Sequence, residues 1–304
     1  MSKKIIRKII TFLLRYSFSK KIDDLLLWPI SKRLFSNYTE IVEIKKDLKI
    51  KVYGDMEDMV NKILLFSSKY VDLAWEPGTA RLADLLSIDS KCAVVAGSHI
   101  GYYPLILGKA NSNIKVFAFE PNPLNRERCI ENVKLNKLQN ISIYDVALGD
   151  KVGQQKMFFD YGQSSFVDSN RRHFGEGIVK INTLDLFLKD KNIKPDLIIL
   201  DAEGYESKIL EGGSDTLFSS HPTIIFELNP SALKAAGSSP EKLNKILNEK
   251  GYSIFIINEG NHGICFNSEI KISLIPYDKY NLENVSFVNA FAIINTDKIK
   301  QYVN

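Results

Sequence analysis

Residues 92–120, CAVVAGSHIGYYPLILGKANSNIKVFAFE, decide the fold. The apolar run Ala93–Ala96 predicts a strand that ends at Gly97, and Ile114–Phe119 predicts a second strand that ends at Glu120. Residues 102–109 between them are long and apolar enough to form a helix. A strand, a helix and a strand within 30 residues predict a parallel pair with a helical crossover.

The same alternation continues along the rest of the chain. A parallel, doubly wound sheet is therefore expected, with ligands bound at the carboxyl ends of its strands. A polar stretch, Asp168–Glu176, interrupts the pattern; it is either an acceptor-binding loop or an ordinary surface loop. Further strands are expected at 141–144, 152–159, 178–182, 197–200, 223–226, 253–257 and 288–294, and helices at 123–138, 207–218 and 240–250, with another opening at Thr183.

The composition is that of a globular protein. The 304 residues are 45% apolar and 25% charged, which excludes a disordered chain, a collagen-like repeat and a coiled-coil rod. No run reaches the roughly 18 apolar residues that a membrane-spanning helix needs. Cys92, Cys129 and Cys265 are scattered and odd in number, which favours a reducing compartment and a cytoplasmic location over a disulfide framework or a zinc site.

Positive charge is concentrated at the N-terminus. Residues 1–50 hold 12 Lys/Arg against 5 Asp/Glu, whereas the remainder is net −3, which disfavours nucleic acid as a partner of the main domain. Cations interleave with apolar residues at helical spacing from Lys3 to Leu14. Either this helix contacts an anionic membrane, a role we assign to residues 1–35, or it packs on the main domain with its charges in solvent. Leu25–Pro29 is expected to end a second helix.

Two features after the first strands point to a nucleoside cofactor. The turn Gly97–Gly101 leads into a helix, so its glycines allow close backbone approach and the helix start offers free N–H groups. Glu120 ends the next strand, where an acidic residue commonly binds both ribose hydroxyls. The pyrophosphate pattern Gly-x-Gly-x-x-Gly is absent, which favours S-adenosylmethionine over NAD or FAD.

An ordered set of motifs then identifies a family. The motifs are VVAGSHIGYY (94–103), FEPNP (119–123), ENVKLN (131–136), DVALGD (145–150), TLD (183–185), LDAEGYE (200–206) and IFELNP (225–230). In this order they resemble FkbM-type S-adenosylmethionine-dependent methyltransferases of class I, over about half of the chain. The resemblance implies an α/β fold with a doubly wound, mostly parallel, seven-stranded Rossmann-like sheet over residues 89–304, preceded by a helical cap over residues 1–88.

The resemblance also places roles on residues of this sequence. Asp201 is implied at the methionine amino group or the acceptor, and Asp201 or Glu203 as the base that takes a proton from an acceptor hydroxyl. It implies O-methylation of a sugar, glycan or other small-molecule hydroxyl, without a metal. The implied cofactor contacts are Gly97, Ser98, His99 and Gly101 at methionine, Glu120, Pro121 and Asn122 at the ribose, Asp145, Val146 and Ala147 at adenine, and Asp201.

The chain departs from the family at two positions. Val95 stands where an acidic residue is usual, and His99 stands where asparagine is usual. The missing carboxylate normally helps hold the cofactor ammonium, and its loss costs about 1.5–3 kcal/mol unless Asp201 compensates. His99 either contacts the cofactor or binds nearby backbone. A degenerate, non-catalytic binding or scaffold protein is therefore the alternative to an enzyme.

Overall fold

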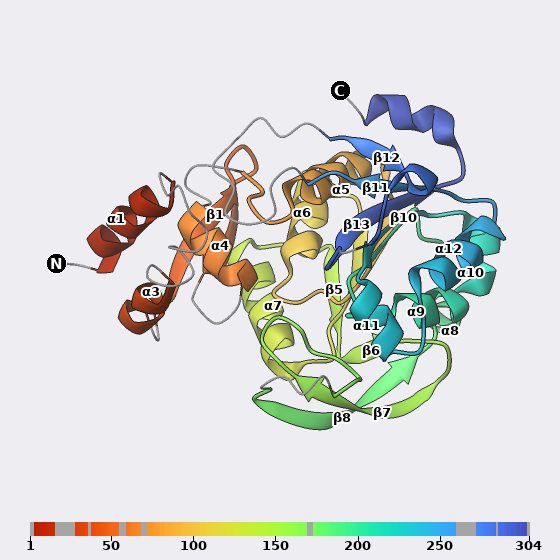
Figure 1. The fold of residues 1–304 in the computed structure, drawn as a ribbon, viewed down its shortest axis with the longest axis horizontal. Helices are drawn as coiled ribbons and strands as arrows, with labels where there is room; N and C mark the ends of the chain where they lie inside the picture. Colours follow the sequence, from red (N-terminus) through yellow and green to blue (C-terminus); the bar gives the residue numbers. More distant parts are fainter. Residues whose placement is uncertain are drawn as a thin grey trace. The chain divides into compact units, whose positions relative to one another are not determined.

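The computed structural model describes residues 3–15, 28–35, 38–54, 59–67, 72–168, 173–259, 272–283 and 285–302 (Figure 1). The chain forms two compact units. The first comprises Met1–Pro77 with Asn261–Ile270, and the second comprises Gly78–Gly260 with Lys271–Asn304. This division falls before the boundary predicted at 88/89.

The first unit combines helices with a two-stranded sheet. Its elements are α1 (Lys3–Arg15), α3 (Trp28–Leu34), β1 (Glu40–Lys45), β2 (Ile50–Gly54) and α4 (Met59–Ser67), and β1 and β2 pair antiparallel. The prediction of a wholly helical cap was therefore wrong, because Val42, Ile44, Ile50 and Val52 alternate into the core of a hairpin.

A proline begins a helix in this unit where the sequence analysis expected one to end. Pro29 is the second residue of α3, a position where its fixed φ suits the first turn and its missing N–H costs no hydrogen bond. The expected helix before it, at 25–27, lies outside the described residues. Pro29 therefore lies at the start of a helix, and the prediction that a helix ends there was wrong.

The second unit is built on an eight-stranded sheet. Its order is β12-β11-β13-β10-β9-β3-β4-β5, and the neighbours from β10 to β5 are parallel. β13 runs antiparallel to β10 and β11, and β12 runs antiparallel to β11. The strands are β3 (Cys92–Ala96), β4 (Lys115–Phe119), β5 (Ile141–Tyr144), β9 (Leu197–Leu200), β10 (Thr223–Leu228), β11 (Ser253–Ile257), β12 (Leu274–Pro276) and β13 (Val288–Ile293).

This arrangement confirms the doubly wound α/β fold. Seven of the nine strands predicted from the sequence lie in this sheet, and its eighth strand is the three-residue edge strand β12. From β3 the chain proceeds to β4 and β5 on one side, and later to β9 and β10 on the other. The order therefore reverses between β3 and β9, and such a switch point is where doubly wound sheets bind ligands.

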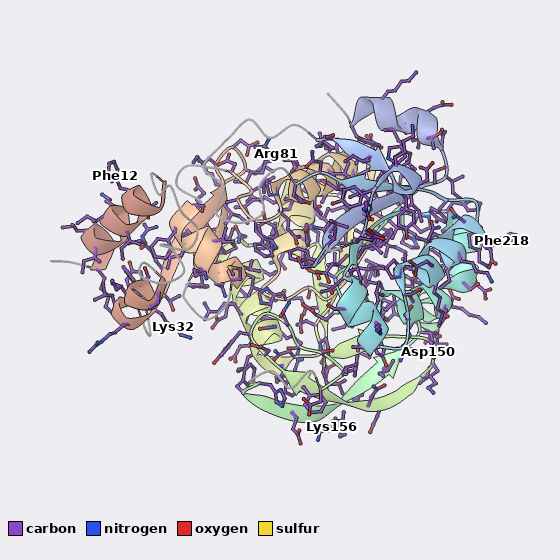
Figure 2. All side chains as sticks on the ribbon, viewed as in Figure 1. Phe12, Lys32, Arg81, Asp150, Lys156 and Phe218 are labelled. Carbon is purple, nitrogen blue, oxygen red and sulfur yellow. The ribbon has the colours of Figure 1, made fainter. Side chains whose placement is uncertain are left out.

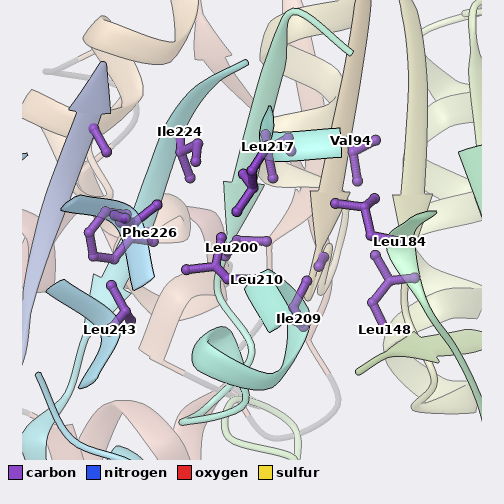
Figure 3. Close-up of a cluster of buried hydrophobic side chains, with 14 of the residues drawn as sticks. Val94, Leu148, Leu184, Leu200, Ile209, Leu210, Leu217, Ile224, Phe226 and Leu243 are labelled. Carbon is purple, nitrogen blue, oxygen red and sulfur yellow. The ribbon is translucent and has the colours of Figure 1, made fainter. Parts of the chain in front are cut away.

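Helices pack on the sheet through alternating strand residues. On one face Val94, Ile198, Leu200, Ile224 and Phe226 contact apolar side chains of the helices α8, α9, α10 and α12 (Figure 3). The other residues of β3, including Val95, are buried as well. A strand buried on both faces has no polar alternation, as a central parallel strand requires. The helices of this unit are α5 (Pro77–Asp89), α6 (Tyr102–Ala110), α7 (Pro123–Leu135), α8 (Leu184–Lys191), α9 (Glu206–Glu211), α10 (Ser214–Ser220), α11 (Pro230–Ala235), α12 (Pro240–Asn248) and the 3₁₀ helices η2 (Tyr277–Lys279) and η3 (Thr296–Gln301).

A second, three-stranded sheet lies between β5 and α8 in the chain. β6 (Val146–Leu148) pairs parallel with β8 (Gly175–Asn182), and β8 pairs antiparallel with β7 (Gly153–Phe159). The strands predicted at 152–159 and 178–182 are these, and β8 begins three residues earlier, inside the polar stretch. The chain between β7 and β8 is described at 160–168 and 173–174.

Candidate active site

The turn after β3 meets the end of β9 at the switch point. A Cβ atom built on Gly97 would lie 1.7 Å from the Asp201 carbonyl oxygen, and the φ of Gly97 is +81°. The Asp201 N–H donates to the Ala96 carbonyl over 2.9 Å. Only glycine fits such an approach. Because Gly97 has no side chain, the predicted cofactor turn lies directly against the backbone of Asp201, the predicted catalytic residue.

Glu120 ties two loops together at the end of β4. Its Oε2 accepts from the His99 N–H over 2.7 Å, and its Oε1 accepts from the Asn122 N–H over 3.0 Å. The side chain is buried, and burial raises the pKa of Glu120 above its usual range. Each carboxylate oxygen keeps a second lone pair. Glu120 thus lies where the ribose contact was predicted, already oriented by two backbone donors.

The amide groups of the glycine turn are already used. The N–H groups of Gly97 and Ser98 both donate to the Phe119 carbonyl, and that of His99 donates to Glu120. These three N–H groups are therefore occupied within the protein. Gly101 has a φ of +90°, and a Cβ there would lie 2.9 Å from the Cys129 sulfur. Both glycines of the turn thus allow it to pack closely against its protein neighbours.

The residues predicted at adenine follow β5. The Glu120 N–H donates to the Tyr144 carbonyl, so Asp145 follows directly at the same end of the sheet. Asp145 is exposed, Val146 is half-buried and Ala147 is buried within β6. The structure therefore places these three residues beside the Glu120 strand end, and their contact with adenine stays a prediction.

A segment after β7 crosses the ends of three strands. We call residues 160–168 the covering segment. The His99 Nε2 lies 2.6 Å from the Tyr161 carbonyl oxygen, and the Asn122 Nδ2 donates to the Asp160 carbonyl over 2.9 Å and to the Ser164 hydroxyl over 2.8 Å.

On the β9 side, Phe166 anchors the same segment. Its ring centroid lies 4.3 Å from that of Tyr205, in the turn after β9. The covering segment thus contacts the loops after β3, β4 and β9. These contacts were not expected from the sequence, because they join residues about 40 to 60 positions apart.

The side chain of Asn122 has two separate roles. Its Oδ1 accepts from the Leu124 N–H and so caps α7, while its Nδ2 anchors the covering segment.

Asn122→Asp keeps a good cap but removes both Nδ2 donors. We expect this variant to weaken S-adenosylhomocysteine binding about tenfold, the value of one or two lost hydrogen bonds, with unchanged helix content. Calorimetry measures the affinity. Asn122→Ala, which loses the cap as well, should also lower thermal stability; equal affinity in Asn122→Asp and the wild type would contradict a role for the segment in binding.

Three carboxylates lie in the turn after β9. Asp201 is half-buried, and burial raises its pKa to about 6, opposed by the charge of His99. Glu203 is half-buried with a φ of +51°. Gly204 follows with a φ of +96°, and a Cβ there would lie 2.4 Å from the Ala232 carbonyl oxygen. The two predicted catalytic candidates therefore lie on a tightly constrained turn.

Glu206 shapes this turn, and the sequence analysis assigned it no role. Its side chain is buried, and its Oε1 accepts from the N–H groups of Ala202 over 2.8 Å and Gly204 over 3.3 Å. Its Oε2 is buried without a hydrogen-bond partner among the described residues. The signal was present in DAEGYE, since an acidic side chain in the first helical turn can accept from the turn's own amides.

The protonation of Glu206 makes stability depend on pH. Burial, and then the charge of Asp201, raise the pKa of Glu206 to about 7, against about 4.3 when unfolded. Between these values the folded state binds more protons, so the free energy of unfolding falls as pH rises from about 4 to 7. Glu206→Gln keeps the Oε1 acceptor without the charge. We expect the variant to be about 1–3 kcal/mol more stable than the wild type at pH 8 and similar near pH 4.

Urea unfolding at both pH values measures this effect. Glu176→Gln is the control, because Glu176 is half exposed and pairs with Lys156 at the surface. The difference in free energy of unfolding between Glu176→Gln and the wild type should be the same at both pH values. A Glu206→Gln protein that is less stable than the wild type at pH 8 would contradict a buried charge at this position.

Comparison with known proteins decides the family. Residues 96–254, just over half of the chain, match the family described as Methyltransferase FkbM domain. The chain belongs to the FkbM methyltransferase family. It therefore contains a methyltransferase domain of Rossmann-like fold, and the cofactor of this domain is S-adenosylmethionine. The matched residues span the turn after β3, Glu120 and the turn after β9.

Individual relatives are distant. The 2-O-methyltransferase NoeI of Sinorhizobium fredii is 27% identical over 121 residues, which cover 34% of this FkbM chain and 49% of NoeI. The chain thus matches about half the length of that curated relative. Among solved structures, a methyltransferase FkbM from Methylobacillus flagellatus is 15% identical with a TM-score of 0.41, covering 67% of this chain and 44% of its own. An O-methyltransferase from Bacillus cereus in complex with SAH is 13% identical with a TM-score of 0.40, and the match covers 71% of this chain and 80% of the Bacillus cereus chain.

The residues present fit S-adenosylmethionine. Gly97 lets the turn after β3 pack against the Asp201 backbone, Glu120 offers a pre-oriented carboxylate to paired hydroxyls, and Asp201 offers a second carboxylate to an ammonium. Two acidic side chains suit a cofactor that carries both an ammonium and a sulfonium. Val95 is buried inside β3, so the family's carboxylate at this place has no substitute on its own strand. Among the described residues, no three His, Cys, Asp or Glu side chains gather closely enough to hold a metal ion.

Proposed function

We propose that this FkbM-family enzyme O-methylates a hydroxyl of a sugar, glycan or other small molecule. The observation that carries the proposal is Asp201, a half-buried carboxylate at the switch point whose pKa lies near 6. At neutral pH it is ionised and can accept a proton, and a base with a pKa near the working pH is the most effective. The similarity to NoeI, a 2-O-methyltransferase, supports a hydroxyl acceptor.

The reaction follows from the residues at the site. When bound, S-adenosylmethionine supplies an electrophilic methyl group on its sulfonium. Glu120 and the backbone at Gly97 hold the donor in one orientation, which is the main requirement of an in-line displacement. Asp201 or Glu203 would take the proton of the acceptor hydroxyl, whose oxygen would receive the methyl group that the bound cofactor supplies.

We propose that the acceptor is neither DNA nor RNA and that the protein works in the cytoplasm. The net charge of −3 over residues 51–304 supports the first statement, because nucleic-acid enzymes surround their sites with cations. Scattered cysteines support the second.

Titration with S-adenosylmethionine and S-adenosylhomocysteine tests this proposal. We expect micromolar binding by calorimetry that Asp201→Ala weakens, followed by methyl transfer to sugars in an acceptor screen. Micromolar cofactor binding with transfer only to nucleic acid or protein would overturn the acceptor class. No binding up to millimolar cofactor would favour the second candidate, a non-catalytic binding protein, which Val95 motivates because it removes a cofactor-holding carboxylate.

A further inference from the structure

Helix α1 is docked on the first unit through a cation. Arg7 is buried; it donates to the Leu65 carbonyl at the end region of α4 over 2.5 Å and pairs with Glu40 of β1 at 3.0 Å. Ile10 and Thr11 are buried on the same side of the helix. The docked face is therefore the one that contains positions 7, 10 and 11, and it is fixed by a buried ion pair as well as by apolar contact.

The opposite face of α1 is apolar and exposed. Ile5, Ile9 and Phe12 are 48%, 45% and 59% exposed. Their spacing of four and three residues places them in one row, and at about 100° per residue this row lies opposite positions 7, 10 and 11. We call these three residues the α1 stripe. Single exposed apolar residues are ordinary, but a contiguous row on one helix marks an interaction surface.

Cations accompany the exposed apolar residues. Lys3 and Lys8 of α1 are exposed. On α3, Ile30 and Leu34 are exposed together with Lys32 and Arg33, and Figure 2 labels Phe12 and Lys32 on these two helices. The first 50 residues carry 12 Lys/Arg and 5 Asp/Glu, whereas the rest of the chain is net negative. Excess positive charge and exposed apolar side chains thus occur on the same two elements.

We propose that the α1 stripe docks on the surface of an anionic phospholipid bilayer. Ile5, Ile9 and Phe12 enter the boundary between headgroups and acyl chains, as the apolar face of an interfacial helix does. Lys8 stands beside the stripe, three residues from Ile5 and four from Phe12, and lies at the level of the anionic headgroups. A second copy of this chain is a poorer occupant, because the same cations would face each other. No helix among the described residues is long and apolar enough to cross a membrane, so the contact proposed is peripheral.

Docking of α1 on the protein and its contact with a membrane do not exclude each other. From the sequence, membrane contact and packing on the main domain, with the charges in solvent, were alternatives. The structure shows that one helix does the packing through Arg7 and leaves an apolar row outside. Packing and membrane contact therefore use different faces and are compatible.

Flotation of the full chain with vesicles tests the proposal. We expect binding to vesicles that contain phosphatidylglycerol and little binding to pure phosphatidylcholine. The triple variant Ile5→Ser, Ile9→Ser and Phe12→Ser should lower the partition coefficient by at least about a hundredfold. Lys8→Glu should lower it about fivefold or more, and raised salt should act in the same direction. The matched control is Phe218→Ser, because Phe218 is a 71% exposed aromatic residue on α10 of the second unit; its binding should equal that of the wild type.

Three outcomes would overturn the proposal. One is equal binding of the wild type to both kinds of vesicle, and another is unchanged binding of the triple variant. The third is a dimer, seen by light scattering without vesicles, that the triple variant abolishes, because the α1 stripe would then be covered by a second copy. Thermal unfolding of each variant shows whether the fold is kept, and we expect it to be, because all five changed side chains are exposed.

Discussion

Gly97→Ala is expected to abolish measurable cofactor binding and to lower the free energy of unfolding by about 2–5 kcal/mol. The new Cβ would lie 1.7 Å from the Asp201 carbonyl oxygen and 2.6 Å from its carbonyl carbon, so backbone must move. The φ of +81° adds strain for any residue with a side chain. Movement of Asp201 would break its N–H bond to Ala96 and displace the carboxylate from the switch point. Urea unfolding and calorimetry with S-adenosylhomocysteine measure the two effects.

Two other glycines separate the causes of this loss. Gly237 has a φ of +78° but no atom within 4 Å of a built Cβ, so Gly237→Ala isolates the cost of the backbone conformation, about 1 kcal/mol. Gly153 has neither a positive φ nor a neighbour, so Gly153→Ala should be close to neutral. If Gly97→Ala were no worse than Gly237→Ala, steric contact between the β3 turn and the end of β9 would play no part.

The main sheet could be predicted from the sequence because its strands are buried on both faces. Runs such as Ala93–Ala96 and Leu197–Leu200 are wholly apolar, and each ends at a polar or glycine residue that marks the carboxyl end. The edge strand Leu274–Pro276 was missed because three residues that end in proline give no period to detect. The hairpin at 40–54 was missed because its short alternation competes with the helical patterns on either side.

The site was predictable only where the sheet itself brings its residues together. Gly97, Glu120 and Asp201 stand at strand ends, and a parallel sheet brings strand ends together whatever lies between them. The covering segment was not predictable, because His99–Tyr161 and Asn122–Ser164 are contacts between distant loops that no periodicity encodes. Glu206 was missed for another reason: its partners are the amides of its own turn, and their importance depends on how deeply that turn is buried.

Replacing Glu120 with glutamine is expected to weaken S-adenosylhomocysteine binding about a hundredfold or more. A glutamine keeps one acceptor oxygen, but both carboxylate oxygens already accept from backbone N–H groups, of His99 and of Asn122. One of these donors would then face an NH₂ group, so the turn after β3 or the loop after β4 must shift. The variant would also have fewer lone pairs left to accept hydrogen bonds from the ribose hydroxyls, the role predicted for Glu120. Each lost bond to a charged acceptor is worth about 1.5–3 kcal/mol, which gives one to two decades in affinity.

The size of the loss distinguishes a ribose contact from a purely structural carboxylate. Calorimetry with S-adenosylhomocysteine and with adenine alone, on Glu120→Gln and on Glu176→Gln as the surface control, separates the two roles. A ribose contact predicts that the variant loses more affinity for the nucleoside ligand than for adenine, which has no hydroxyl to bind. Equal losses for both ligands would mean that Glu120 acts only by holding the His99 and Asn122 loops in place, because a displaced loop would affect every occupant of the site.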